Sequence, residues 1–163
     1  GALPAQIARA EKRAVNKVTR WMAKGTLKDI AASVGVAQKI LDDRVRSLDH
    51  GYNGIAAGLV WFGLNPVAIT KRRFGTLTQT PAGAKAGRLS FPGAFVARMD
   101  SGHIGAFRRR GRARFPIDHE SLVIDSTAHR AMIDAWANRA EARLETVMGQ
   151  ELNYEVNVKG LGK

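Results

Sequence analysis

The chain has 163 residues, a formal net charge of +12 and no cysteine. This length favours one domain with its own core. The absence of cysteine excludes disulfide scaffolds, zinc–thiolate centres and cysteine nucleophiles. The longest apolar run, residues 55–64, is too short to cross a bilayer, and charged residues near the start argue against a secretory signal. We therefore expect no membrane partner.

A helical pattern opens the chain. Apolar residues recur every three or four positions, which predicts an amphipathic helix over residues 4–24 with a basic outer face. Pro4 suits the first turn of this helix and Gly25 suits its end. The positions expected to face the core are Leu3, Ile7, Ala10, Ala14, Val18 and Trp21.

Two shorter helices are predicted next. Thr26 can cap the first, Gly35 can end it, and residues 37–48 can form the second. Two helices around a tight turn resemble the helix-turn-helix of DNA-binding regulators. However, Asp42 and Asp43 on the reading helix would face DNA phosphates unfavourably.

The middle of the chain predicts β-structure. Residues 55–64 have the composition of a strand, whereas residues 76–88 lack periodicity and suggest a long exposed loop. Two apolar runs within residues 89–99 and 104–108 flank the polar turn at 100–103, which is the pattern of a β-hairpin.

Positive charge is concentrated in this middle part. Residues 51–114 carry eleven Lys or Arg and one acid, whereas residues 115–163 carry five Lys or Arg and eight acids. Such cationic groups require water, carboxylates, phosphates or another subunit. The candidate contact residues are Lys71, Arg72, Arg73, Arg108, Arg109, Arg110, Arg112 and Arg114.

Three interpretations of the charge remain open: a nucleic-acid surface, a contact with the acidic part of a second copy, or a solvated face. We expect residues 107–110 to contact a neighbouring subunit, and residues 71–73 to contact DNA or a partner. In a subunit contact, the acids available on the last helix are Glu141, Glu145 and Glu151.

The last long element is a predicted amphipathic helix over residues 126–152, and residues 153–163 are predicted to be a flexible tail. The expected apolar stripe of the helix consists of Ile133, Trp136, Ala137, Ala140, Leu144, Val147 and Met148. The fold class is thus α+β, a single domain over residues 1–152. It contains a small antiparallel sheet flanked by a long N-terminal helix, a short helical hairpin and a long C-terminal helix.

No catalytic, cofactor-binding or metal-binding residue is predicted. Asp118, His119 and Glu120 are adjacent, but a metal site would need further ligands from elsewhere. Ser101 and His103 are two residues apart in a turn, where a nucleophile and its base seldom align. We therefore expect no enzyme and no cofactor.

The order of several motifs resembles a known family. Residues 60–66 read Val-Trp-Phe-Gly-Leu-Asn-Pro, residues 93–97 read Gly-Ala-Phe-Val-Ala, and residues 105–111 read Gly-Ala-Phe-Arg-Arg-Arg-Gly. With Ser-Gly-His at 101–103 and the long final helix, this order resembles the minor tail protein Z family of tailed bacteriophages and prophages. The resemblance covers about residues 5–152.

The resemblance implies a structural virion protein at the head-proximal end of a phage tail, made in the host bacterial cytoplasm. Its expected partners are further copies of itself in a hexameric ring and the neighbouring tail terminator, tail tube or head-completion proteins. The phage DNA end is a further expected contact, without sequence specificity. The alternatives are a helix-turn-helix regulator using residues 27–48 and a general nucleic-acid-binding protein.

Overall fold

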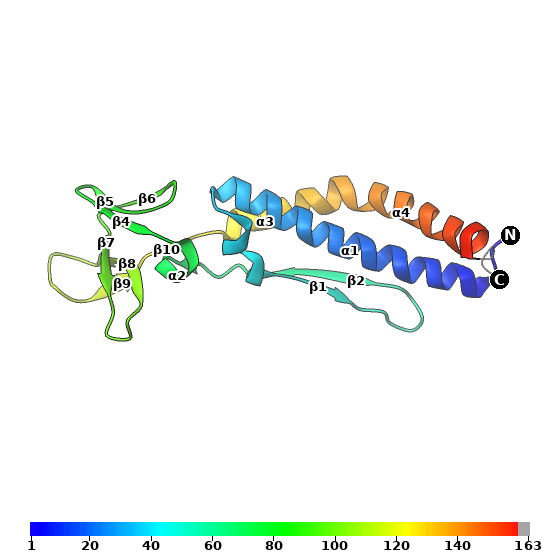
Figure 1. Cartoon of the computed structure of the whole chain (residues 1–163), viewed down its shortest axis with the longest axis horizontal. Coiled ribbons are helices and arrows are strands. Elements are labelled where there is room, and N and C mark those ends of the chain that lie inside the picture. Colours follow the sequence, from blue (N-terminus) through cyan, green and yellow to red (C-terminus); the bar gives the residue numbers. More distant parts are fainter. Residues whose placement is uncertain (160–163) are drawn as a thin grey trace.

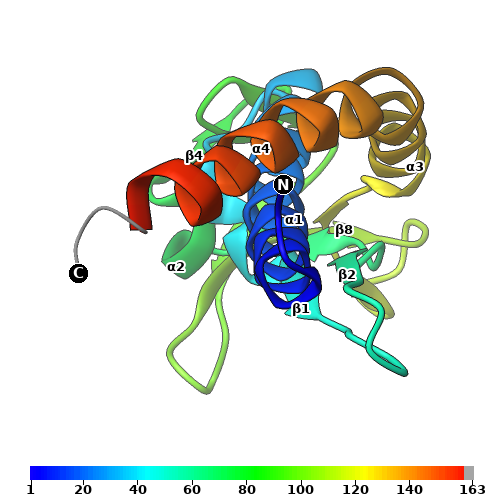
Figure 2. The same cartoon turned by 90° about the vertical axis from the view of Figure 1, so that its right-hand side faces the viewer.

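The computed structural model describes residues 1–159 as an elongated molecule with a helical half and a β half (Figure 1). The helical half contains α1 (Pro4–Val34), α3 (Asp125–Ala135), α4 (Glu141–Asn153) and the hairpin of β1 (Val45–Asp49) and β2 (Gly58–Phe62). Viewed along the long axis, α1 lies between α4 and this hairpin (Figure 2). The β half is built from residues 67–122 and is inserted between β2 and α3.

The first helix is longer than predicted. Gly25 does not end α1, and Thr26 is buried inside it rather than capping a new helix. A glycine in a helix costs about 1 kcal/mol relative to alanine, and packing on α3 and α4 offsets this cost. The helix ends at Gly35, whose φ of 76° is left-handed and whose N–H bonds to the carbonyls of Ala31 and Ala32.

The predicted helix over residues 37–48 is absent, so there is no helical hairpin. Residues 38–40 and 42–44 form two single 3₁₀ turns, and residues 45–49 form β1. Ile40 and Leu41 are buried and anchor these turns in the core. Antiparallel pairing with the apolar strand β2 outweighs the helical pattern, because β2 supplies the backbone hydrogen-bond partners of residues 45–49.

The β1–β2 hairpin lies along α1 (Figure 1), and β2 falls within the predicted strand region 55–64. Its register places Val45 opposite Phe62 and Asp49 opposite Gly58. Gly58 comes so close to α1 that an added Cβ would lie 1.8 Å from Thr19 Oγ1. A residue without a side chain is therefore required where the hairpin crosses the helix.

Small antiparallel sheets make up the β half. One has the order β4–β5–β6, a second has the order β7–β8–β9, and β10 pairs with β3. Besides the short helix α2 (Lys71–Phe74), the elements are β3 (Val67–Ala68), β4 (Leu77–Thr80), β5 (Gly83–Ala86), β6 (Leu89–Pro92), β7 (Phe95–Arg98), β8 (Ile104–Arg109), β9 (Ile117–His119) and β10 (Ser121–Leu122).

Two β predictions are corrected and one is confirmed. Residues 76–88 are not a long loop but the β4–β5 hairpin, in which the small residues Ala84 and Ala86 are buried. Residues 89–99 are not one strand, because Gly93, with φ of 75°, separates β6 from β7. The hairpin across residues 100–103 is confirmed, with Phe95 opposite Phe107.

Three apolar clusters form the core. The cluster where the halves meet contains Ile30, Leu41, Phe62, Val67 and Ile124. The cluster between α1 and the C-terminal helices contains Ala14, Val18, Met22, Ala135 and Val147. The cluster of the β half contains Ile69, Ala84, Ala86, Ala94 and Ala106. Phe74 and Leu122 pack against both the first and the third cluster and so connect the two halves.

The C-terminal helix continues past the predicted end. α3 leads through a π-helical turn (Trp136–Ala140) into α4, and a second π-helical turn covers Tyr154–Val158. The prediction of a flexible tail is therefore wrong for residues 153–158, while residues 160–163 lie outside the described part. The α+β class is confirmed, with a long helix at each end of the chain and small antiparallel sheets between them.

Buried carboxylates explain why the helix continues. Glu155 accepts hydrogen bonds from Arg9 (3.0 Å) and Arg13 (2.6 Å), and Glu151 accepts from Arg13 (2.6 Å) and Lys17. Hydrogen bonds from Arg9 and Arg13 lower the pKa of Glu155 to about 2. Those from Arg13 and Lys17 lower the pKa of Glu151. Part of the basic face of α1 thus holds the C-terminal helix and is not free for partners.

Candidate nucleic-acid and subunit interface

The basic run at residues 71–73 forms α2, a single helical turn. Thr70 begins it, and its Oγ1 accepts a hydrogen bond from the backbone N–H of Arg73 at 3.3 Å. Lys71 is exposed at the start of the turn, and Arg72 is exposed beside it. These two side chains form no ion pair among residues 1–159, so their charge faces solvent or a partner.

Arg73 has a structural role instead. Its guanidinium donates to both carboxylate oxygens of Asp43, at 2.9 and 2.8 Å, and to the carbonyl of Ile40 at 2.8 Å. The hydrogen bond from Arg73 lowers the pKa of Asp43. Arg73 therefore fastens α2 to the 3₁₀ turns of the helical half, and the expectation of a DNA or partner contact fits only Lys71 and Arg72.

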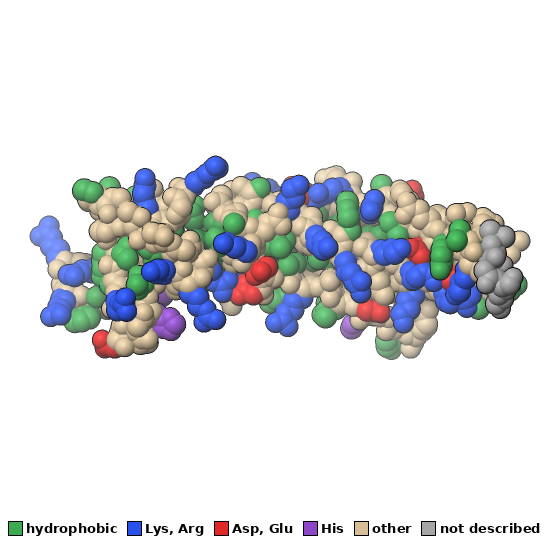
Figure 3. All heavy atoms as spheres, in the orientation of Figure 1, with side chains coloured by type: hydrophobic (Ala, Val, Ile, Leu, Met, Phe, Trp, Pro, Cys, Tyr) green, Lys and Arg blue, Asp and Glu red, His purple; other side chains and the backbone are tan. Residues whose placement is uncertain are grey.

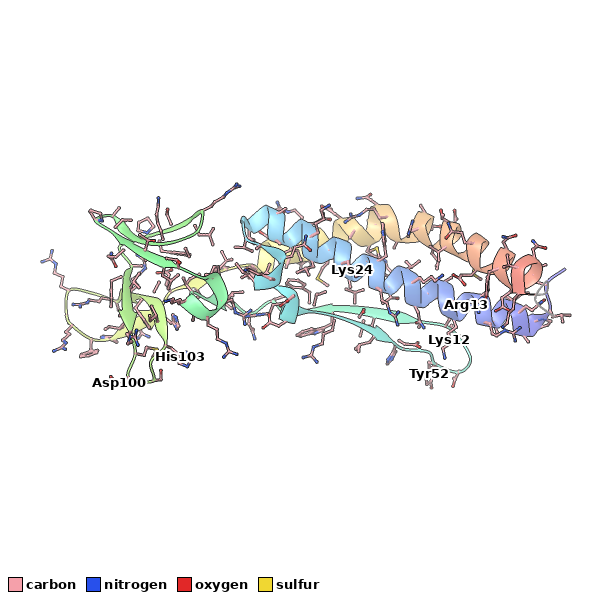
Figure 4. All side chains as sticks on the ribbon, viewed as in Figure 1. Lys12, Arg13, Lys24, Tyr52, Asp100 and His103 are labelled. Atoms are coloured by element: carbon pink, nitrogen blue, oxygen red, sulfur yellow. The ribbon has the colours of Figure 1, made fainter. Side chains whose placement is uncertain are left out.

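A polar hollow of about 790 Å³ lies beside α2. Lys39, Arg44 and Arg72 line it, together with His103 from the β7–β8 turn. Figure 4 shows His103 and Asp100 at that turn. Arg44 was not among the sequence candidates. Its guanidinium donates to the carbonyls of Asn65 and Pro66.

The arginine run after β8 lies at the free end of the β half. Residues 108–116 are all exposed, and the loop between β8 and β9 forms the tip farthest from the helices (Figure 1). Among the charged side chains on the face shown in Figure 3, Lys and Arg outnumber Asp and Glu, both at this tip and along the helical half. Figure 4 places Lys12 and Lys24 on α1 within that basic surface.

Two of the five arginines have carboxylate partners within the chain. Arg110 donates to both oxygens of Asp118 at 2.8 Å, and the hydrogen bond lowers the pKa of Asp118. Arg108 donates to Glu120 at 2.9 Å. These pairs fix the base of the loop along β8 and β9, so the expected subunit contact of residues 107–110 is partly replaced by internal pairing.

The other three arginines keep their charge available. Arg109 lies over the ring of Phe95 at 5.3 Å, and Arg114 lies over Phe115 at 5.5 Å. Arg112 is exposed, and none of the three forms an ion pair within residues 1–159. Because Phe115 is also 65% exposed, the loop presents an aromatic ring among unpaired cations.

The three neighbouring residues first weighed as metal ligands are engaged in structural contacts. Asp118 and Glu120 pair with the arginines described above. His119 lies 3.1 Å from the carbonyl of Ile69 and stacks on Phe107 with ring centroids 4.7 Å apart. Across residues 1–159 there is no group of three or more metal-ligating side chains.

An apolar groove on the helical half was not predicted. It lies between β2 and the α3–π-helix segment, which share one side of α1 (Figure 2), and has a volume of about 550 Å³. Leu59, Ile133 and Trp136 line it, and Trp136 is 70% exposed. A neighbouring hollow of about 610 Å³ shares Trp136 and extends to Glu141 and Leu144.

This groove corrects the predicted apolar stripe of the last helix. Of its members, Val147 is buried, whereas Ile133, Trp136, Ala137 and Leu144 are exposed. The π-helical turn at 136–140 adds a residue to the turn and changes which side chains face α1. The sequence therefore identified an apolar face, but residues 1–159 leave part of that face uncovered.

Comparisons with models of known protein families, with curated proteins and with solved structures give no match to this chain. Among residues 1–159, no helix combines the length and apolar character needed to cross a membrane.

Proposed function

We propose that the chain is a structural subunit that joins macromolecules at the head-proximal end of a phage tail. Its copies form a ring, expected with sixfold symmetry, that contacts tail terminator, tail tube or head-completion proteins and the DNA end. The phage setting rests on the motif resemblance between residues 60 and 111.

One structural observation carries the assembly role. The molecule exposes two surfaces that are suited to binding a partner and lie far apart. One is the cationic loop 108–116 at one end, and the other is the apolar groove around Trp136 on the helical half. An exposed apolar groove is stabilised when a partner removes it from water, and exposed cations can pair with the carboxylates or phosphates of a partner. Both surfaces on one elongated subunit suit an assembling component.

The test is genetic and structural. Phage particles produced from a genome that encodes this chain should contain the protein by mass spectrometry, and deletion of its gene should leave filled heads and tails that do not join in electron micrographs. Complementation with the wild-type gene should restore joined particles. Particles that lack the protein, or a deletion that leaves joining intact, would refute the proposal.

A second function, binding of nucleic acid without sequence specificity, is favoured by the unpaired cations. Lys71, Arg72, Arg109, Arg112 and Arg114 form no ion pair within residues 1–159. If all five contact phosphates, the logarithm of the DNA affinity should fall with the logarithm of salt with a slope of about −4 to −5, and each substitution by alanine should reduce the slope by about 0.9. A salt-independent or base-specific affinity would contradict this function.

The helix-turn-helix alternative has no structural basis. The residues proposed as the reading helix, 37–48, form 3₁₀ turns and the strand β1, and Ile40 and Leu41 are buried in the core. No helix is therefore available there to enter a major groove.

A further inference from the structure

The two uncovered surfaces are complementary in charge. The helix around the groove carries three exposed carboxylates, Asp134, Glu141 and Glu145, which form no ion pair within residues 1–159. The arginine loop carries three unpaired cations, Arg109, Arg112 and Arg114.

Two arginines of the same helical segment are already engaged, whereas Arg130 of α3 is exposed and forms no ion pair within residues 1–159. Arg139 donates to Asp29 at 2.5 Å, and Arg143 lies over the ring of Trp21 at 5.0 Å. Glu151, which was expected to receive a neighbour's arginine, is buried and bonded to Arg13 and Lys17. Of the three available carboxylates, Glu141 lines the hollow next to the groove, and Asp134 and Glu145 lie on the same helical segment.

The apolar parts of the two surfaces also match. Phe115 projects at the loop, and the groove between Leu59, Ile133 and Trp136 is concave and apolar. An aromatic anchor in an apolar pocket with charged pairs at the rim is the usual organisation of a specific protein interface.

These surfaces cannot meet within one molecule. The loop lies at the tip of the β half, and α3 and α4 belong to the helical half (Figure 1). A contact between them must therefore join two copies, and because it uses different surfaces on each copy it is heterologous. Such a contact generates a closed ring when the rotation between copies fits, and an open filament otherwise.

We infer that the arginine loop of one copy docks into the apolar groove of the next, with Phe115 inserted beside Trp136 and the loop arginines paired with Asp134, Glu141 and Glu145. This contact would be the subunit interface of the proposed assembly. The inference rests on the part of the proposed function that requires copies of the chain to associate, and not on the phage setting.

The absence of native cysteine allows a direct test by cross-linking. Two single variants are prepared in the full chain, Arg112→Cys in the loop and Ala137→Cys in the groove, both at exposed positions. They are mixed at high concentration and treated with a short thiol cross-linker. The mixture should give heterodimers, whereas Arg112→Cys alone should not, because a heterologous contact keeps the two loops apart.

The matched control tests whether a different segment of the neighbouring copy occupies the apolar groove. Tyr52 at the tip of the β1–β2 hairpin is 72% exposed and offers an aromatic ring at a different place on the surface (Figure 4). A mixture of Tyr52→Cys with Ala137→Cys should give at least tenfold less heterodimer than the loop pair. Preferential cross-linking of the hairpin tip, or no cross-linking of the loop pair, would overturn the inference.

Charge reversal supplies an independent readout. Arg112→Glu should reduce self-association measured by sedimentation, and combining it with chains that carry Glu141→Arg should restore it. Wild-type association should also weaken as salt rises. Loss without restoration would overturn the proposed pairing. The gene-deletion phenotype of the virion proposal does not depend on these results, so the two can fail separately.

Discussion

Gly58 shows how a single missing side chain determines the packing of two elements. An alanine Cβ there would meet Thr19 Oγ1 at 1.8 Å and Thr19 Cβ at 2.9 Å. Gly58→Ala should therefore lower the free energy of unfolding by about 1–3 kcal/mol, which is typical of overpacking. Thermal and urea denaturation measure this loss.

A double variant and a second glycine provide the controls. Thr19→Ala removes the nearest atom and should recover part of the loss, so the two substitutions should be non-additive. Gly149 lies within α4, where an added Cβ meets nothing within 4 Å, so Gly149→Ala should raise stability by up to about 1 kcal/mol. Equal destabilisation by both glycine substitutions would contradict the steric explanation.

Glu155 should give the protein a characteristic acid sensitivity. Its pKa is about 2 in the folded chain because of Arg9 and Arg13, against an ordinary value of 4.5. A depressed carboxyl pKa contributes stability that is fully present above the ordinary value and is lost as the pH falls toward the folded value. The midpoint temperature should therefore decrease between pH 4.5 and pH 2.

The variant Glu155→Gln isolates this contribution. It should be less stable than wild type at pH 7, and the difference should shrink progressively as the pH approaches 2. Asp100→Asn, which changes an exposed carboxylate with no ion pair among the described residues, should match wild type throughout. A constant difference between Glu155→Gln and wild type across this pH range would show that the ion pairs are not its cause.

At the scale of elements, substitutions in α2 should distinguish a basic residue that stabilises the fold from one that is available to a partner. Arg73→Ala removes hydrogen bonds to Asp43 and Ile40 and should cost about 1–2 kcal/mol, a charge-assisted contact discounted for its partial exposure. Lys71→Ala should change stability by less than about 0.5 kcal/mol. The reverse order should hold for DNA affinity if the second proposed function operates.

Element predictions from the sequence succeeded where packing agreed with the local pattern. The opening helix, the β7–β8 hairpin and the C-terminal helix were predictable from periodicity and turn residues. The helical conformation of Gly25 and the turns and strand of residues 37–48 were not predictable, because contacts with distant segments determine them. Arg139 reaches across to Asp29 over the helix that Gly25 was expected to end, and β2 captures residues 45–49 as a strand.

The candidate site was predictable only in part, because ion pairs between segments distant in the sequence determine which arginines remain available. The sequence identifies the basic runs, but not that Arg73, Arg108 and Arg110 find carboxylates in the same chain. It also identifies the apolar face of the last helix, but not that the π-helical turn leaves Trp136 uncovered. Which charges and which apolar groups remain available depends on contacts between distant segments.

At the scale of the whole molecule, the two halves should differ in local stability. The buried cluster of the β half consists of four alanines around Ile69, with Phe107 as a further large buried residue, whereas the cluster at the end of α1 contains Ile30, Leu41 and Phe62. Burial of apolar area contributes about 25 cal/mol per Å², so alanines contribute little. Amides of β4–β6 should therefore exchange hydrogen with a lower free energy of opening than amides in the centre of α1.

The variant Ile30→Ala distinguishes local opening from global unfolding. This substitution in the helical half should lower global stability by about 2–5 kcal/mol, because Ile30 is fully buried. If the β half opens by itself, the free energy of opening of β5 amides should stay unchanged while that of α1 amides falls. Parallel decreases in both halves would mean that the insertion unfolds only with the helices, through the shared contacts of Phe74 and Leu122.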